Sequence, residues 1–387
     1  MTGFGSKCRN FSNFISFRGP AATFQTSSMD VKKEILITGG AGFVGSSIAL
    51  YIKKHYPGYG ITCLDNLKRR GSELNLPRLA AAGVRFVHGD IRNREDLYPF
   101  EHGLTTIIEA SAEPSVLAGI DSAPDYLVNT NLMGTINCLY LAARTKADFL
   151  FLSTSRVYPI GAIERILFSE NDTRFVISSG QQIAGVSANG ISEGFPIDGS
   201  RSLYGATKLS SEFLIQEFNT FYKLRTVITR FGVITGPWQM GKVDQGVIVL
   251  WVARHFWKKE LAYFGYGGKG RQVRDILHVD DLCKLIDYQL HHPEEMNGRL
   301  FNAGGGAEIN VSLRELTKIC ERVTGNTVAI REVAEDRAAD IRLYITDNSA
   351  VTAATGWKPG ISVEQIVTDI YHWIQENEAL LKPILIG

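Results

Sequence analysis

The chain has 387 residues, 44% of them hydrophobic and 21% charged, which is enough apolar material for one large domain or two modest ones. Forty-one Lys and Arg against forty Asp and Glu leave a net charge of +1, which argues against nucleic acid and anionic membranes as partners. No apolar run approaches the roughly twenty residues needed to span a bilayer. The five scattered cysteines form no Cys-x-x-Cys pair, so we expect a reduced, cytoplasmic protein without a metal site.

Residues 1–30 differ from the rest of the chain. No acidic residue precedes Asp30, and the basic residues Lys7, Arg9 and Arg18 are mixed with Ser, Thr and Phe. This composition loosely fits a transit-type leader, but the apolar core of a secretory signal is missing. We favour a disordered extension, or upstream sequence before a natural start at Met29.

From residue 34 onward, short apolar runs alternate with helical patterns. The runs 34–38, 60–64, 84–88, 105–110, 149–153 and 226–231 predict strands, and 43–54, 132–144 and 207–222 predict helices. Buried strands that alternate with helices form βαβ units, so the predicted fold class is α/β, a doubly wound parallel Rossmann sheet. We expect a dinucleotide-binding domain over 31–232, with an insert at 160–200 towards the substrate side. A smaller α+β substrate-binding lobe is expected over 233–387, interleaved with the first domain.

A glycine-rich turn follows the first predicted strand. Gly39, Gly42 and Gly45 open a helix, which permits a tight turn, close approach of a pyrophosphate and tight helix–strand packing. Asp65 ends the second strand, where a carboxylate can bind both ribose hydroxyls and repel a 2′-phosphate. Asp90 ends the third strand and could reach the adenine or cap the next helix. The pattern predicts NAD rather than NADP, although the Lys-Arg-Arg run shortly after Asp65 could instead bind a phosphate.

A tyrosine and a lysine, Tyr204 and Lys208, stand four residues apart and therefore on one helix face. A free phenol, with a pKa of about 10, is a poor base at neutral pH, and a neighbouring cation favours the phenolate. The pair follows a strand that ends in the hydroxyls of Ser153 and Thr154, at the edge of the sheet where ligands bind. Although the same spacing occurs on surface helices, this context predicts that Tyr204 is a catalytic base.

Together these motifs resemble an extended short-chain dehydrogenase/reductase of the nucleotide-sugar epimerase/dehydratase family, over about residues 33–375. Further matching segments are 65–66, 89–91, 131–135, 153–154, 274–281 and 356–359. Segments 243–246 and 267–281, and the insert before Tyr204, are most similar to the CDP-sugar 2-epimerase branch. The resemblance implies bound NAD and a nucleotide-diphosphate sugar as substrate. It also implies a homodimer or higher homo-oligomer built on helices near 97–100 and 131–143.

The resemblance also implies the site residues. Thr154 orients the sugar hydroxyl, Tyr204 is the base, and Lys208 activates it and holds the nicotinamide ribose. Implied cofactor contacts are Gly39, Gly42, Phe43, Val44, Gly45, Asp65, Asn66, Asp90, Ile91, Ala110, Ser111, Asn131, Ser153, Tyr204, Lys208 and Phe231. Implied substrate contacts are Thr154, Glu193, Gln245, Arg274 and Arg342, with the two arginines on the pyrophosphate.

The chain departs from the family pattern at several positions. Glu109 stands where the family usually has a histidine, Val233 replaces a polar residue, and Arg156 with Pro159 replaces the usual run into Tyr-Gly. Ser155 and Arg156 occupy the positions of the dehydratases' Asp-Glu pair, and neither can do that pair's acid–base work. We therefore expect an epimerase that acts through a transient ketose. The alternatives are a nucleotide-sugar reductase, another epimerase of the 4-epimerase type, and a non-catalytic dinucleotide-binding sensor or scaffold.

Overall fold

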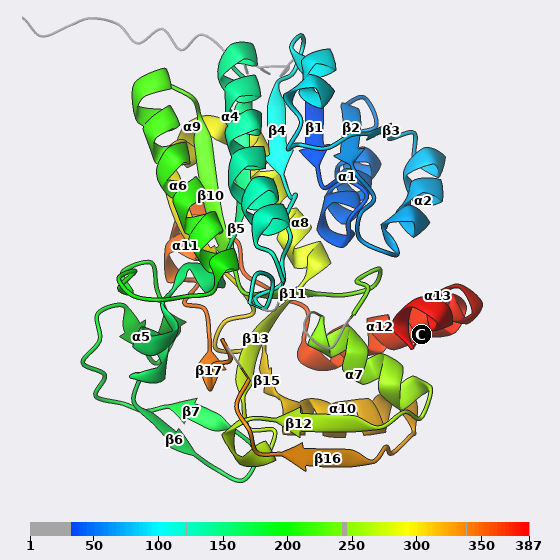
Figure 1. Ribbon diagram of the computed structural model, residues 1–387, viewed down its shortest axis with the longest axis vertical. Helices are drawn as coiled ribbons and strands as arrows, with labels where there is room; N and C mark the ends of the chain where they lie inside the picture. The colour runs from blue at the N-terminus through cyan, green and yellow to red at the C-terminus, as the bar shows by residue number, and fades with distance from the viewer. Residues whose placement is uncertain (1–31, 121, 242–245, 338, 387) are drawn as a thin grey trace, which may run out of the picture. The chain divides into compact units, whose positions relative to one another are not determined.

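The computed structural model describes residues 32–120, 122–241, 246–337 and 339–386. The extension expected at 1–30 and the candidate substrate contact Gln245 lie outside these ranges. Residues Lys33–Gly387 cluster into one compact unit (Figure 1). The boundary at residue 232 between two domains therefore stays a prediction.

Seven parallel strands form the central sheet, in the order β14-β10-β5-β4-β1-β2-β3. Their bounds are β1 (Glu34–Thr38), β2 (Gly60–Asp65), β3 (Arg85–His88), β4 (Thr106–Glu109), β5 (Asp148–Thr154), β10 (Thr226–Phe231) and β14 (Arg299–Ala303). The strand order reverses between β1 and β4, and such a switch point is where nucleotides bind in open parallel sheets. The predicted fold class is confirmed.

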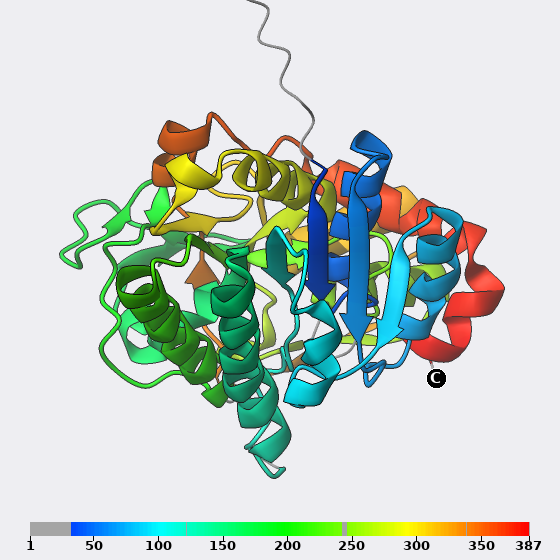
Figure 2. The same cartoon turned by 90° about the horizontal axis from the view of Figure 1, so that it is seen from above.

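Helices cover both faces of this sheet because successive side chains of a buried strand point to opposite sides. Ile35 and Ile37 of β1 pack with α1 (Phe43–His55) and α8 (Val279–His291). Leu36 packs on the other face with α4 (Gly134–Thr145) and α6 (Leu203–Tyr222) (Figure 2). Shorter helices are η1 (Ser72–Asn75), α2 (Leu76–Ala81), η2 (Arg94–Phe100), α3 (Asp125–Val128), η3 (Asn129–Met133), η4 (Ser155–Val157), η5 (Tyr266–Gly268), α9 (Pro293–Met296) and α11 (Ser349–Thr355).

A second layer of structure lies below the central sheet in Figure 1. It contains a four-stranded sheet of β11 (Val233–Thr235), β13 (Val273–His278), β15 (Asn310–Ser312) and β17 (Leu343–Tyr344), and a pair of β12 (Leu261–Phe264) with β16 (Ile330–Val333). Its helices are α7 (Val247–Phe256), α10 (Leu313–Thr324), α12 (Val363–Glu376) and α13 (Glu378–Leu385). Their apolar faces share one core around Trp251 and Ile370. α8 and β14 follow elements of this second layer in the chain and return to the central sheet.

The insert before α6 folds into short elements rather than one long loop. They are α5 (Ile160–Glu164), the hairpin of β6 (Phe168–Glu170) with β7 (Phe175–Ile177), and the hairpin of β8 (Val186–Ser187) with β9 (Gly190–Ile191). Its apolar side chains pack against Tyr344 of β17, among them Tyr158, Ile163 and Phe195. The insert is therefore anchored to the second layer.

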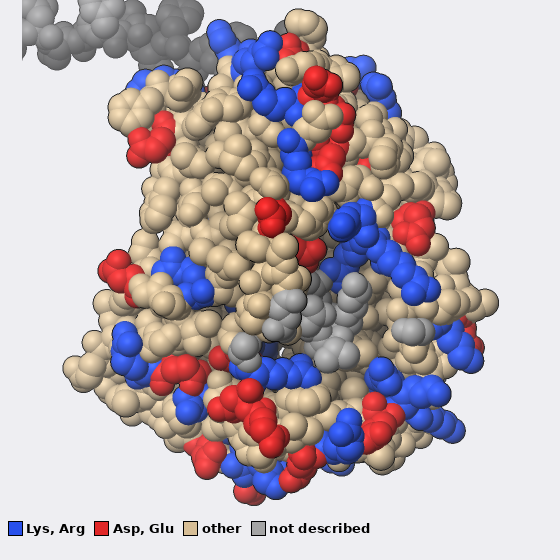
Figure 3. All heavy atoms as spheres, viewed as in Figure 1, with Lys and Arg blue, Asp and Glu red and all other residues tan. Residues whose placement is uncertain are grey.

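The described residues also bear on membrane and metal binding. Within those ranges no helix combines the length and apolarity required to cross a membrane. Nor does any group of three or more His, Cys, Asp or Glu side chains there form a candidate metal site. On the face drawn in Figure 3, basic and acidic side chains are interspersed, in keeping with the net charge of +1.

Candidate active site

The glycine turn joins β1 to α1 at the switch point of the sheet. Gly39 adopts a φ of 65°, and a Cβ there would lie 2.7 Å from the carbonyl oxygen of Ala110. A Cβ on Gly45 would collide with the carbonyl of Gly39, so the helix can approach the turn only without a side chain at that position. Gly42 forms the N-cap of α1. The turn thus leaves an open, backbone-lined cradle of the kind that a pyrophosphate occupies.

Two carboxylates stand at the adenosine end of this cradle. Asp65 accepts hydrogen bonds from the backbone N–H of Ala41 (3.1 Å) and of Leu67 (2.8 Å). Burial raises the pKa of Asp65, and these hydrogen bonds oppose the rise. Burial alone would also raise the pKa of Asp90, but hydrogen bonds from Arg92 and Asn66 outweigh it and lower that pKa to about 2.

A cavity of about 400 Å³ runs along this edge of the sheet. Eight residues that the sequence assigned to the cofactor line it: Gly39, Gly42, Asp65, Asn66, Asp90, Ile91, Ala110 and Ser111. Glu113 and Tyr126 also line it, and neither was assigned from the sequence. The remaining candidates are not among its lining residues: Phe43, Val44, Gly45, Asn131, Ser153, Tyr204, Lys208 and Phe231. The cradle, the paired acids and this volume fit a bound dinucleotide.

The basic run 68–70 lines this cavity and also contacts other protein groups. Lys68 lies 4.4 Å above the ring of Tyr126. The Arg69 guanidinium donates to the carbonyl of Met240 (3.0 Å), and that of Arg70 donates to the carbonyl of Pro383 (2.8 Å). Arg69 and Arg70 are therefore bonded to the second layer, while all three cations still line the cofactor cavity, so the preference for NAD rests on Asp65.

The candidate base Tyr204 lies in the first turn of α6. Ser202 caps this helix by accepting a hydrogen bond from the N–H of Gly205 (3.2 Å). Burial raises the pKa of Tyr204, while a hydrogen bond with the Thr154 side chain and the charge of Arg156 lower it. The charge of Glu113 raises it. The structure therefore brings the predicted residues Thr154 and Tyr204 together. The charges of Arg156 and Glu113 shift the pKa of the phenol in opposite directions.

Lys208 lies near two carboxylates that were not predicted from the sequence, Glu109 and Glu212. It is buried one helical turn beyond Tyr204, with its ammonium 3.9 Å from the ring centre of Phe151. Burial lowers its pKa, and the charges of Glu109 and Glu212 raise it. Glu109, at the end of β4, is fully buried and accepts a hydrogen bond from Thr135 (3.0 Å). Burial raises the pKa of Glu109 to about 7, and the charge of Lys208 opposes that rise.

A buried polar network fixes the ends of β5, α6 and β10. Glu212 receives the Ser153 hydroxyl and pairs with Arg230, whose Nη2 lies 2.6 Å from Oε2. Arg230 also donates to the hydroxyl of Tyr158 (3.1 Å). Ser153, a predicted cofactor contact, therefore uses its hydroxyl inside the protein. Asn131 does the same, because its amide bonds the backbone of Glu113 at 2.8 and 3.1 Å.

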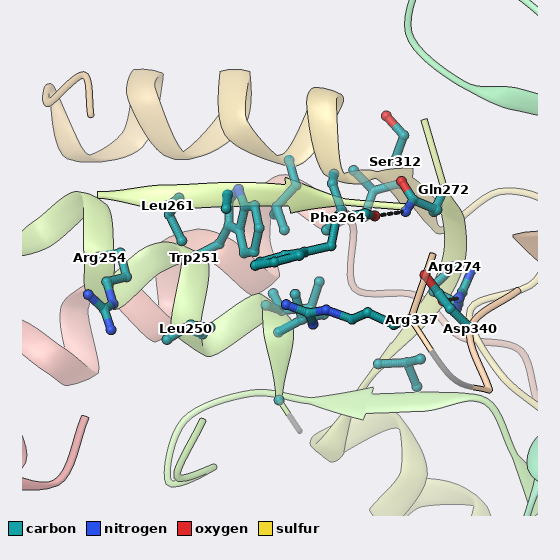
Figure 4. Close-up of a pocket in the computed structure, with 18 of the residues that line it drawn as sticks. Leu250, Trp251, Arg254, Leu261, Phe264, Gln272, Arg274, Ser312, Arg337 and Asp340 are labelled. Carbon is teal, nitrogen blue, oxygen red and sulfur yellow. Dashed lines mark hydrogen bonds and ion pairs between the residues drawn. The ribbon is translucent and has the colours of Figure 1, made fainter. Parts of the chain in front are cut away.

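A second cavity, of about 500 Å³, lies between the central sheet and the second layer. Figure 4 shows Arg274 joined to Asp340 (2.8 Å) towards one end and Trp251 with Arg254 towards the other. Between them the Arg337 guanidinium lies 3.7 Å from the ring centre of Phe264. Arg156 lines the same cavity. Basic and aromatic groups in this order suit a diphosphate joined to a base.

Of the five predicted substrate contacts, only Arg274 is among the described residues that line this cavity. Thr154 does not line it and hydrogen-bonds the Tyr204 phenol. Arg342 lies outside its lining and pairs with Glu164 of the insert, over the rings of Phe168 and Tyr266. Glu193 accepts a hydrogen bond from the N–H of Asn302 (2.6 Å) and holds the insert on β14. Gln245 lies outside the described residues. Arg337, which does line the cavity, was missed because it follows no family motif.

These features define an enzyme with a dinucleotide site on a Rossmann sheet, a buried tyrosine at the start of α6 and a second cavity lined by Arg156 and Arg274. The profile of the NAD dependent epimerase/dehydratase family matches residues 35–304, and the chain belongs to that family. It is 29% identical over 352 residues to CDP-paratose 2-epimerase of Salmonella typhi, covering 88% of this chain and 98% of that protein. It is 32% identical over 333 residues to the low-salt glycan biosynthesis protein Agl12 of Haloferax volcanii, covering 86% and 95%.

Solved structures agree with this assignment. The dTDP-glucose 4,6-dehydratase of Bacillus anthracis in complex with NAD superposes with a TM-score of 0.73 at 25% identity, covering 91% of this chain and 99% of that one. The UDP-glucose 4-epimerase of Thermotoga maritima with UDP-glucose gives a TM-score of 0.71 at 25% identity, covering 89% and 99%. The expected family and its NAD cofactor are confirmed.

Proposed function

We propose that this chain is an NAD-dependent epimerase of a nucleotide-diphosphate sugar that acts through a transient ketose, most like CDP-paratose 2-epimerase. One observation carries the choice of reaction. The residues after Thr154 are Ser155 and Arg156, and Arg156 extends into the substrate cavity. Elimination of water requires an added acid and base, and neither residue supplies a carboxyl group. Epimerisation requires only the tyrosine and the cofactor.

The chain's own residues account for the proton transfers. NAD, held by the glycine turn and Asp65, would supply a reversible hydride acceptor for a sugar carbon. Tyr204 takes the proton of the sugar hydroxyl on its phenolate oxygen and later gives it back, so no proton is lost over a cycle. Thr154, which hydrogen-bonds the phenol, orients that hydroxyl. The cavity of about 500 Å³ offers room for the ketose to turn before the hydride returns.

The substrate cavity supports a nucleotide-diphosphate sugar as ligand. Arg274 and Arg337 offer guanidinium groups to a diphosphate, and Phe264 and Trp251 offer apolar surface to a base. The relative from Salmonella typhi is named for a CDP-sugar, and cytidine diphosphate is the nucleotide we propose here. We also propose a homodimer or higher homo-oligomer, supported by exposed aromatic side chains on α4 and α6.

A panel of CDP-, UDP-, GDP- and dTDP-sugars, followed by NMR, tests this proposal. We expect one CDP-sugar to yield a new epimer, with no loss of water and no net formation of NADH. A dehydrated keto sugar would contradict the proposal in favour of a dehydratase, and net consumption of NADPH would favour a reductase. Inversion at carbon 4 of a UDP-sugar would instead identify a 4-epimerase, as in the 27%-identical UDP-glucuronate 4-epimerase of Thermodesulfobacterium geofontis.

A further inference from the structure

Tyr126 lines the adenosine end of the cofactor cavity and has no part in the site predicted from the sequence. It belongs to α3, the short helix after β4, and its side chain is half-buried. Asn66, Lys68 and Asp90 line the same end of the cavity. Because these three residues follow β2 and β3, a side chain from the segment after β4 meets the loops of two other strands here.

Two cations lie against the ring of Tyr126. Lys68 Nζ is 4.4 Å and the Arg92 guanidinium carbon 4.6 Å from the ring centre. At such distances the face of an aromatic ring attracts a cation. Arg92 is itself fixed, because its Nε and Nη2 donate to the carboxylate of Asp90 at distances from 2.6 to 3.0 Å. The ring is therefore held by one cation from the loop after β2 and by another from the loop after β3.

The side chain of Asn66 joins the same three segments. Its Nδ2 donates to Asp90 Oδ2 (2.9 Å) and to the hydroxyl of Tyr126 (3.4 Å). Its oxygen accepts the N–H of Lys68 (3.0 Å), in a turn where Leu67 adopts a left-handed φ of 54°. This turn sets the position of Lys68. The segments after β2, β3 and β4 are thus tied to one another around the adenosine end of the cavity.

We propose that Tyr126 is a cofactor-retaining residue, which slows the release of NAD because Lys68 and Arg92 hold its ring at the adenosine end of the cavity. Release requires the tied segments to separate, so each contact between them lowers the release rate. Lys68 acts through the ring and is a positioning residue. The inference rests on the NAD cofactor and its cavity and not on the sugar. It suits the proposed epimerase, because the same dinucleotide must serve both halves of each cycle.

The rate at which NAD leaves the protein tests this proposal without any substrate. The full chain is loaded with radiolabelled NAD, excess unlabelled NAD is added, and the retained label is followed by rapid filtration. We expect Tyr126→Leu to release NAD about 10-fold faster than the wild type, because both ring contacts are lost. Tyr126→Phe keeps the ring and should stay within about twofold of the wild type. A Tyr126→Leu variant that releases NAD no faster than Tyr126→Phe would overturn the proposal.

A double-mutant cycle distinguishes a cation that acts through the ring from one that binds NAD directly, since Lys68 also lines the cavity. We expect Lys68→Met to speed release about threefold in the wild-type background and to have no effect in the Tyr126→Leu background. Lys68→Arg should restore the wild-type rate. Equal effects of Lys68→Met in both backgrounds, or no effect in the wild-type background, would contradict the proposal.

Arg94→Met is the matched control for loss of a cation from an aromatic ring. The Arg94 guanidinium lies 5.1 Å from the ring centre of Tyr140, and neither residue lines the cofactor cavity, so the release rate should not change. Lys68 is exposed, so Lys68→Met still decides the matter should Tyr126→Leu fail to fold. Because release of NAD requires no turnover, failure of every nucleotide sugar as substrate would refute the proposed function and leave this result standing.

Discussion

At the scale of single residues, Tyr204 combines a partly buried phenol with one hydrogen-bonding neighbour, Thr154. Tyr204→Phe removes only the hydroxyl, so NAD affinity should stay near that of the wild type. Turnover should fall by about 100-fold or more, because the sugar hydroxyl loses its proton acceptor. Tyr56→Phe, which removes a hydroxyl bonded to Asp287 at 3.3 Å, is the matched control. Near-normal turnover in Tyr204→Phe would show that another group is the base.

We expect Asp65 to be the residue that discriminates between NAD and NADP. Asp65→Asn removes the negative charge and keeps an acceptor oxygen for only one of the N–H groups of Ala41 and Leu67, which bond different carboxylate oxygens. A charge-assisted hydrogen bond contributes about 1.5–3 kcal/mol, so NAD should bind about 10- to 100-fold more weakly. The ratio of the affinity for NAD to the affinity for NADP should also become smaller. Fluorescence titration with both cofactors measures this, and an unchanged ratio of the two affinities would contradict the assignment.

The site residues predicted from the sequence belong to short local motifs, whereas the contacts that were missed depend on segments that meet only in the folded protein. Gly39, Asp65 and Tyr204 belong to short motifs whose spacing alone sets a turn, a strand end or a helix face. Glu212 is one helical turn from Lys208, but Glu109 comes from β4, far earlier in the chain, so its charge beside Lys208 is visible only after folding. The pairing of Arg342 with Glu164 has the same origin, because the insert supplies the carboxylate.

At the scale of elements, the buried parallel strands were the most predictable. β1 and β10 have the bounds expected from their apolar runs, since both faces of such strands are covered. The strands of the insert were not predicted, because β8 and β9 contain two residues each and depend on pairing for their existence. β14 was also missed, since it joins the sheet far along the chain from β10.

The ends of α1 and α8 meet in a cluster whose contribution to stability depends on pH. His291 lies 3.0 Å from Asp287 Oδ1 and 3.0 Å from the Tyr59 hydroxyl. The hydrogen bond with Asp287 raises the pKa of His291 in the folded protein. The unfolded value is about 6.5, so this stabilisation is complete below that pH and is lost as pH rises through the folded pKa.

His291→Leu should therefore lower the Tm by more at a pH of about 5.5 than at about 9, with a difference of roughly 2 °C. Thermal melts at the two pH values measure it. In an Asp287→Asn background the substitution should have the same effect at both pH values. Equal effects of His291→Leu at both pH values in the wild-type background would show that His291 is not coupled to Asp287 in solution.

At the scale of the whole molecule, the two cavities are kept adjacent by arginines of the cofactor side that reach the second layer. Arg69 and Arg70 bond the carbonyls of Met240 and Pro383, and Arg78 lies 3.9 Å from the ring centre of Trp238. From the sequence, Arg69 and Arg70 were interpreted as a solvated or phosphate-binding run, because nothing local shows which distant carbonyl each will meet. The site is thus a property of the whole fold.

The face formed by α4 and α6 carries solvent-exposed aromatic side chains. Tyr140 of α4 is 42% exposed and lies 6.0 Å from the ring of Phe218 of α6, which stacks on Tyr222, itself 65% exposed. If this face joins two copies, as the family resemblance implies, Tyr140→Glu should place a charge inside the interface and shift the protein to monomers. Light scattering coupled to size exclusion measures the change.

Leu380→Glu is the control, because it adds the same charge at a 45% exposed apolar position on α13. A wild type that is monomeric at micromolar concentration, or a Tyr140→Glu variant that stays dimeric, would show that this face is not the interface.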